Sequence, residues 1–226
     1  MAARGRRCVL AGLLGAAAVC AGCDLGSAAY FLMPEAKQPP QLKRLASDDK
    51  NKEVRVVILT WSGLETRPEL AQADRELGER LAKQLRELCE SNQEKVIIVS
   101  PRKVEEFKST HPTWRDLDLQ DIGRRFHADY LIYLEINSLR LYKPGSFNTM
   151  FRGEANLTVS VVDVRKQDEP QERKEFSCAY PSEARGEIPV GDSNVMEFRQ
   201  AFLTYVAKRL SWFFSPYPKR DSYFVE

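Results

Sequence analysis

The chain has 226 residues, of which 43% are hydrophobic and 29% charged, enough for one sizeable core or at most two small ones. This composition excludes collagen-like and wholly disordered proteins, and a single long apolar run, at the N-terminus, excludes a multi-span membrane protein. The formal net charge of +2 arises from Arg4, Arg6 and Arg7, because the residues after position 22 include 31 basic and 32 acidic side chains. The basic excess therefore gives no support for nucleic-acid binding.

Residues 1–23 have the three-part layout of a secretory signal. Three arginines precede an apolar stretch over residues 8–21, and the segment ends in Val-Cys-Ala-Gly-Cys. This ending resembles the lipobox of bacterial lipoproteins, in which the cysteine is acylated and becomes the first residue after cleavage. The resemblance implies a signal peptide over residues 1–22 and a lipid on Cys23.

Two alternatives remain for this segment. Residues 8–33 are long enough for an uncleaved signal-anchor helix, although Asp24 near its middle would cost about 2.5–3.5 kcal/mol on insertion. Ordinary secretion with a free Cys23 is the other alternative. All three place the rest of the chain outside the cytoplasm, and we expect a domain facing the periplasm from the inner or the outer membrane.

Composition divides the remainder at residue 52. Residues 34–52 contain three prolines, many charges and no apolar period, so we expect residues 23–52 to be a lipidated N-terminus and a flexible tether. Residues 53–226 are predicted to form a single globular domain. Its two cysteines, Cys89 and Cys178, could form a disulfide, but their apolar surroundings favour two buried thiols.

The domain begins with a strand–helix–strand unit. Residues 54–61 and 95–100 are short apolar runs typical of buried strands, and residues 68–91 between them carry leucines at helical spacing. This spacing predicts a parallel crossover.

A short helix, a second helix and a hairpin follow. The elements expected after the crossover are a short helix near Val104 and Phe107, a helix over 117–126 capped by Asp116 or Asp118, strands over 129–142, 151–165 and 174–180, and a final helix over 195–214. The order β-α-β-α-β-β-β-α predicts an α/β (α+β) fold, a mixed sheet of about five strands with helices packed in two or three layers.

One passage carries a family resemblance. Residues 120–132, Gln-Asp-Ile-Gly-Arg-Arg-Phe-His-Ala-Asp-Tyr-Leu-Ile, are similar to a passage of extracytoplasmic lipoproteins related to CsgG, LpoB and the TolB N-terminal domain. The resemblance implies that Gly123 lets a helix approach the sheet and that Ala128 and Asp129 form a tight entry into the next strand. Gly153, before a strand ending in Val-Val-Asp-Val, resembles a later strand of that family.

The resemblance implies a lipid-anchored periplasmic interaction domain, not an enzyme. The chain departs from the family at Leu134-Glu135, and the pore-forming hairpins of CsgG have no counterpart in it, so channel formation is not implied. We expect the partners to be the membrane, through the lipid, and another envelope protein or a second copy of the chain. An exposed interaction surface is predicted at Trp61, Leu64, Tyr217, Tyr223 and Phe224.

Residues that could support catalysis are few. His111 is expected at the surface and His127 at a helix–strand junction, and we expect no metal or other cofactor. Asp116, Asp118 and Asp121 are interpreted as helix-capping residues, and Asp163 as a turn partner.

Two other classes of function stay open. An extracytoplasmic hydrolase would use loop carboxylates such as Asp116 or Asp163, which would have to meet in a cleft with a raised pKa. A homo-oligomeric structural lipoprotein is the other alternative.

Overall fold

The computed structural model describes residues 36–63, 68–166, 171–182 and 185–219. Its main sheet has the strand order β3-β2-β4-β5-β6, and a short strand, β7, pairs with the far end of β5. The bounds of these strands are β2 Val54–Ser62, β3 Val96–Ile98, β4 Tyr130–Tyr142, β5 Met150–Asp163, β6 Glu172–Tyr180 and β7 Ile188–Pro189. Strand β2 is parallel to β3 and β4, whereas β4, β5 and β6 are antiparallel neighbours. The predicted mixed α/β sheet and the order of its elements are thereby confirmed.

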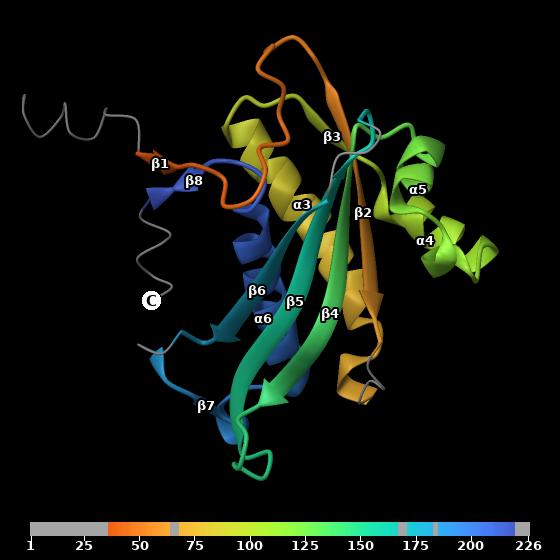
Figure 1. Cartoon of the computed structure of the whole chain (residues 1–226). Helices are drawn as coiled ribbons and strands as arrows, with labels where there is room; N and C mark the ends of the chain where they lie inside the picture. The colour runs from red at the N-terminus through yellow and green to blue at the C-terminus, as the bar shows by residue number, and fades with distance from the viewer. Residues whose placement is uncertain (1–35, 64–67, 167–170, 183–184, 220–226) are drawn as a thin grey trace, which may run out of the picture. The chain divides into compact units, whose positions relative to one another are not determined.

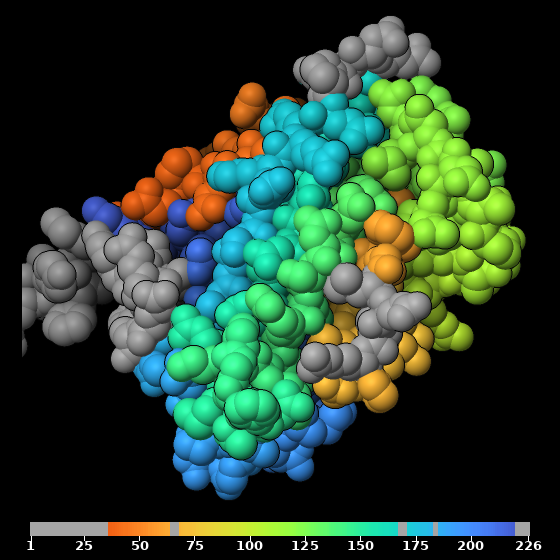
Figure 2. Space-filling view, turned by 60° about the horizontal axis from the view of Figure 1, so that its bottom comes forward, coloured from red at the N-terminus to blue at the C-terminus, as the bar shows by residue number. Residues whose placement is uncertain are grey.

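Helices cover the two faces of the sheet unequally. Helices α3 (Ala73–Ser91) and α6 (Val195–Ser211) pack on one face over most of the strands, and their apolar side chains form the larger core with it (Figure 1). Helices α4 (Pro101–Thr110) and α5 (Leu119–Arg125) build a smaller core on the other face, against β2, β4 and the end of β5. The fold therefore has three layers at β2 and β4. Beside α4 and α5, side chains of β4, β5 and β6 lie at the surface (Figure 2).

The helix bounds depart from the expected ones where the backbone turns. The leucine-rich helix begins at Ala73, because Pro68–Leu70 forms a 3-10 turn and Gln72 has a left-handed backbone, with φ 59°. Helix α6 ends at Ser211, and Phe213 and Phe214 continue as turns that remain buried.

The predicted flexible tether is wrong for its second half. The compact unit that contains the sheet begins at Lys37, and Leu45 is 1% exposed in the core. The main-chain N–H groups of Gln41, Leu42 and Leu45 donate to carbonyls of residues 212–214 at 3.0, 3.0 and 3.2 Å. The segment is ordered because these carbonyls follow the end of α6, where no helical N–H reaches them.

A second, two-stranded sheet extends this contact. Strand β1 (Lys37–Gln38) is antiparallel to β8 (Tyr217–Pro218), near the two ends of the described chain. Proline and charge composition gave no sign of this pairing, because the partner strands lie about 180 residues apart in the sequence.

Candidate functional site

The family-like passage forms a tight corner between α5 and β4. Asp118 caps α5 as expected, since its Oδ1 accepts from the N–H of Gln120 at 2.6 Å. A Cβ at Gly123 would lie 2.4 Å from Cγ2 of Val164, so the helix approaches the sheet as closely as the resemblance implies. Ala128 then donates its N–H to the carbonyl of Gly123 at 3.0 Å, which closes the turn into β4. Gly153 plays a similar packing role on the opposite face, where a Cβ would lie 2.5 Å from the ring of Phe202.

Asp129 joins three segments at this corner. Its N–H donates to the carbonyl of Arg55 at 2.7 Å, and its Oδ2 accepts from the N–H of Arg55 at 2.8 Å. Its own carbonyl accepts from the N–H of Val164 at 2.9 Å. The start of β2, the start of β4 and the end of β5 are thus held together by main-chain and carboxylate contacts of one residue.

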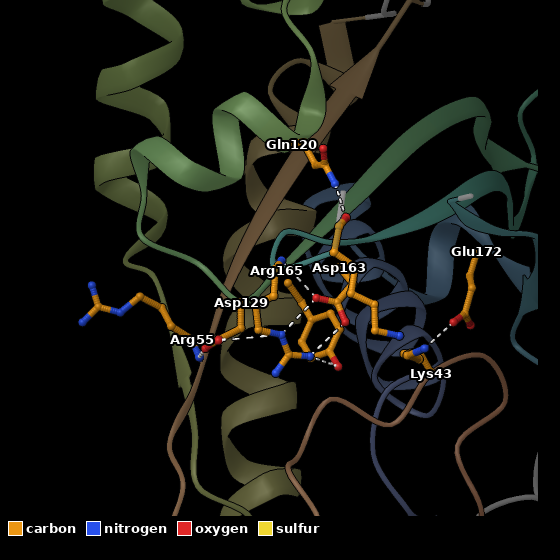
Figure 3. A network of polar contacts seen from close by, with 9 residues as sticks. Lys43, Arg55, Gln120, Asp129, Asp163, Arg165 and Glu172 are labelled. Carbon is orange, nitrogen blue, oxygen red and sulfur yellow. Dashed lines mark hydrogen bonds and ion pairs between the residues drawn. The ribbon is translucent and has the colours of Figure 1, made fainter. Parts of the chain in front are cut away.

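A polar network extends from this corner to the end of β5 (Figure 3). The Arg165 guanidinium donates to Asp163 at 2.9–3.0 Å, also contacts the Tyr130 hydroxyl, and lies 3.9 Å from Asp129. Burial alone would raise the pKa of Asp163, but the hydrogen bonds and charge of Arg165 hold that pKa below its usual value. The same hydrogen bonds raise the pKa of Arg165.

This network bears on the hydrolase alternative. Asp163 is anionic and engaged with Arg165, so it lacks the raised pKa that a general acid requires, whereas Asp116 is exposed at the end of a 3-10 turn. Among the residues that the structure describes, no group of three or more His, Cys, Asp or Glu side chains could hold a metal ion. The role of Asp163 as a turn partner agrees with the interpretation from the sequence, since it accepts the N–H of Arg165 at 3.1 Å.

Each of the two histidines contacts residues of α4 or α5. The ring of His111 stacks on Phe107 at a centroid distance of 4.5 Å, and its Nε2 lies 3.3 Å from Nη1 of Arg125. His127 has a left-handed backbone, with φ 50°, and donates its N–H to the carbonyl of Arg124 at the end of α5.

The two cysteines of the domain are free thiols, as the sequence favours. Cys89 is buried and Cys178 half-buried. Burial, with the charge of Glu94, raises the pKa of Cys89 to about 12, and burial raises the pKa of Cys178 to about 12. Both are therefore protonated and poorly nucleophilic at neutral pH.

The predicted interaction surface is not assembled as expected. Tyr217 is 7% exposed because it pairs in β8 and stacks on Trp212 at 4.7 Å, so it is not available as a surface residue. Trp61 is half-buried, with the Arg115 guanidinium 5.2 Å from its ring. Leu64, Tyr223 and Phe224 lie outside the described residues, as does Cys23.

Exposed apolar side chains gather instead at the far end of the β4–β5 hairpin. Phe147 at the hairpin tip is 96% exposed, Met196 in the first turn of α6 is 50% exposed, and Val190 is 38% exposed. Val190 donates its N–H to the carbonyl of Thr149, and the hairpin tip, β7 and the start of α6 lie at the same end of the sheet (Figure 1). We call Phe147, Val190 and Met196 the hairpin end.

The backbone presents Phe147 in a fixed turn. Ser146 donates both its N–H and its hydroxyl to the carbonyl of Lys143, and Thr149 donates in the same way to the carbonyl of Ser146. Phe147 and Asn148 have left-handed backbones, with φ 50° and 62°. This conformation is costly for a bulky residue, and no burial of the ring within the described domain offsets it. The signal for this exposed tip in the sequence is a phenylalanine directly after Pro-Gly-Ser.

Within the described ranges, no helix combines the length and apolarity needed to cross a membrane. A scan against protein-family models finds no match, and a search of curated proteins finds none either.

Solved structures give distant likenesses. The PelC dodecamer from Paraburkholderia phytofirmans is 13% identical, with 79% of this chain and 96% of that chain covered and a TM-score of 0.40. Lipoprotein GNA1162 from Neisseria meningitidis is 12% identical, with 70% and 98% covered and a TM-score of 0.42. The hypothetical protein CT253 from Chlamydia trachomatis is 13% identical, with 72% and 98% covered and a TM-score of 0.42. Likenesses this distant assign no function, and they do not show the expected similarity to CsgG, LpoB or TolB, which stays a prediction.

Proposed function

We propose that this chain is a lipoprotein of the bacterial cell envelope, anchored through Cys23, whose α/β domain binds another envelope protein through the hairpin end. The role proposed is binding, with no catalytic step. The observation that carries it is Phe147, an aromatic side chain that is 96% exposed on a turn whose backbone is held in a left-handed conformation.

The anchor rests on the sequence around Cys23. A basic start, an apolar run and the ending Ala-Gly-Cys support acylation of this cysteine. Residues 24–36 separate Cys23 from the compact unit that begins at Lys37, and thirteen residues reach at most about 45 Å when fully extended.

Chemistry at the hairpin end favours a protein partner over a lipid surface. Residues 144–149, Pro-Gly-Ser-Phe-Asn-Thr, include no charged side chain that would attract anionic lipid. A single aromatic side chain on a pre-formed turn suits a pocket in a partner, where desolvated aromatic residues supply much of the binding free energy. The partner expected is therefore a protein with an apolar pocket that accepts Phe147.

The partner can be captured in intact cells with a photocrosslinking amino acid at position 147. The matched control places the same amino acid at position 86, where Arg86 is exposed on α3. We expect a crosslinked adduct with a second envelope protein from position 147 and none from position 86. Adducts only with lipid, or only with another copy of the chain, would overturn the proposal.

The contribution of the ring is measured with the captured partner. Phe147→Ser should weaken binding by about thirtyfold or more, as expected for the loss of a central aromatic contact, whereas Phe147→Tyr should retain most of the affinity. Equal affinity of the Phe147→Ser variant would exclude the hairpin end as the binding surface.

The anchor needs a separate test. Cells are fed a fatty-acid probe, and the chain is compared with its Cys23→Ala variant. We expect labelling and membrane retention in the first case and neither in the second. Unchanged membrane retention of the variant would contradict anchoring through Cys23.

A further inference from the structure

A second surface feature lies away from the hairpin end, where the end of β3, the start of α4 and the end of α5 enclose a half-open cavity of about 350 Å³. This volume is within the range of small-ligand sites. Four basic side chains line the cavity, those of Arg55, Lys103, Arg125 and His127, and none of its described lining residues is acidic.

The fixed cations of this cavity form no ion pairs with carboxylates of the part of the chain that the structure describes. Within the described parts of the chain, Arg55, Lys103 and Arg125 form no ion pair with Asp or Glu, although such pairs are common elsewhere in those parts. The Asp129 carboxylate accepts from the main-chain N–H of Arg55, and the Arg55 side chain points away from Asp163 and Arg165 (Figure 3). Cations that converge without counter-charge repel one another, and a bound anion would relieve this repulsion.

The start of α4 borders the same cavity. Ser100 occupies the N-cap position and lines the cavity, but its side chain makes no capping hydrogen bond. The turn contains no acidic residue and instead carries Arg102 and Lys103, although the N-terminus of a helix is itself electropositive. An anion at this position would complement both the helix and the basic side chains.

Apolar side chains also line the cavity. Phe126 is half-buried, and Ile97 leaves 40% of its surface exposed. Basic and apolar side chains in one cavity suit an anionic group and offer contact surface to a less polar substituent.

We propose that this cavity binds a phosphate group, either esterified or as the free ion. The planar guanidinium groups of Arg55 and Arg125 can each donate two hydrogen bonds to a pair of phosphate oxygens, and Lys103 and the Ser100 hydroxyl supply further donors. The phosphate can come from the headgroup of an anionic phospholipid or from a soluble phosphate. This proposal does not depend on the hairpin end or on the lipid at Cys23.

Calorimetric titration of the full chain in a nonionic detergent tests the site. The probes are inorganic phosphate, glycerophosphoglycerol as the headgroup of an anionic phospholipid, and glycerophosphocholine as a headgroup with a compensating positive charge. We expect saturable binding of phosphate or glycerophosphoglycerol that weakens with added salt, and weaker binding of glycerophosphocholine. Tighter binding of glycerophosphoglycerol identifies the headgroup as the source, and tighter binding of phosphate identifies the soluble ion. Absence of saturable binding of both would overturn the proposal.

Substitution of the basic lining residues tests whether the phosphate binds in this cavity. Arg55→Gln, Lys103→Gln and Arg125→Gln combined should weaken binding by about tenfold or more. The matched control combines Lys83→Gln, Arg86→Gln and Arg173→Gln, which removes the same charge from exposed positions of α3 and β6 and should change affinity less than about twofold. Equal losses in the two triple variants would show a general charge effect and would overturn the site. Thermal unfolding of each variant verifies that it is folded.

Discussion

Gly123 of α5 and Val164 at the end of β5 lie so close that a Cβ on the glycine would be 2.4 Å from Cγ2 of the valine. The contact seats α5 on the sheet next to the Arg165 network, because the N–H of Val164 is bound by the carbonyl of Asp129. The packing of α5, the entry into β4 and the neighbouring Arg165 network therefore depend on the absence of a side chain at position 123.

The first prediction concerns the lack of room for a side chain at position 123. Gly123→Ala should lower the free energy of unfolding by about 1–3 kcal/mol, because the added methyl group overpacks a buried contact. Val164→Ala in the same chain should recover part of the loss, which chemical denaturation of the two single variants and the double variant would measure. Gly191→Ala is the control, since nothing lies within 4 Å of its Cβ, and it should change stability by less than about 0.5 kcal/mol.

The second prediction concerns pH. Because the pKa of Asp163 is lowered in the folded state, its stabilising contribution is present above the unfolded-state pKa near 4 and is lost as the pH falls through the lowered folded value. Asp163→Asn should therefore cost about 1–2 kcal/mol at pH 7 and progressively less in acid. Denaturation curves from pH 7 to pH 3 measure this convergence. As a control, Asp121→Asn removes an exposed ion pair with Arg124 and should lower the free energy of unfolding by less than about 0.5 kcal/mol. A loss of stability in Asp163→Asn that does not change with pH would contradict this prediction.

Hydrophobic periodicity predicted the parts of the fold whose signal is local. The run over residues 54–61, the leucine stripe of α3 and the hairpin of β4 and β5 each carry their pattern within a few residues. Asp118 was a correct cap candidate for the same reason.

Long-range pairing accounts for what the sequence did not reveal. Leu45 lies in a segment of prolines and charges, and its burial depends on carbonyls near residue 213. Tyr217 looked like one of several exposed aromatic residues, but its pairing with Gln38 buries it. The exposure of Phe147 follows from the way its hairpin projects, and the basic cavity combines residues from three separate elements, so neither leaves a contiguous motif.

The third prediction tests whether residues 37–47 belong to the domain. Leu45→Ala should lower the free energy of unfolding by about 2–4 kcal/mol, because it removes a side chain that is 1% exposed in the main core. Deletion of residues 1–47 should give a lower melting temperature than deletion of residues 1–36. Equal melting temperatures of the two deletions would show that this segment contributes nothing to stability.

The fourth prediction concerns the ion pair between α3 and α6. Arg199 is 4% exposed, donates two hydrogen bonds to Glu76 at 2.8 and 2.9 Å, and donates a third to the carbonyl of Ala71 at 3.0 Å. Glu76→Gln leaves this guanidinium buried without a counter-charge and should cost about 2–4 kcal/mol, because a buried charge without its partner is strongly destabilising.

Replacement of both Glu76 and Arg199 measures what the ion pair contributes to the free energy of unfolding, apart from the cost of leaving one buried charge without its partner. Glu76→Leu with Arg199→Met should cost less than Glu76→Gln alone, because neither charge then remains in the interface between the helices. Glu79→Gln provides the exposed comparison, since Arg75 and Glu79 pair at 3.1 Å on the solvent side of α3, and it should cost less than about 0.5 kcal/mol. Urea denaturation of these three variants measures the differences. If Glu76→Gln cost no more than Glu79→Gln, the pair would behave as a surface contact, and the packing of α6 on α3 would rest on its apolar side chains alone.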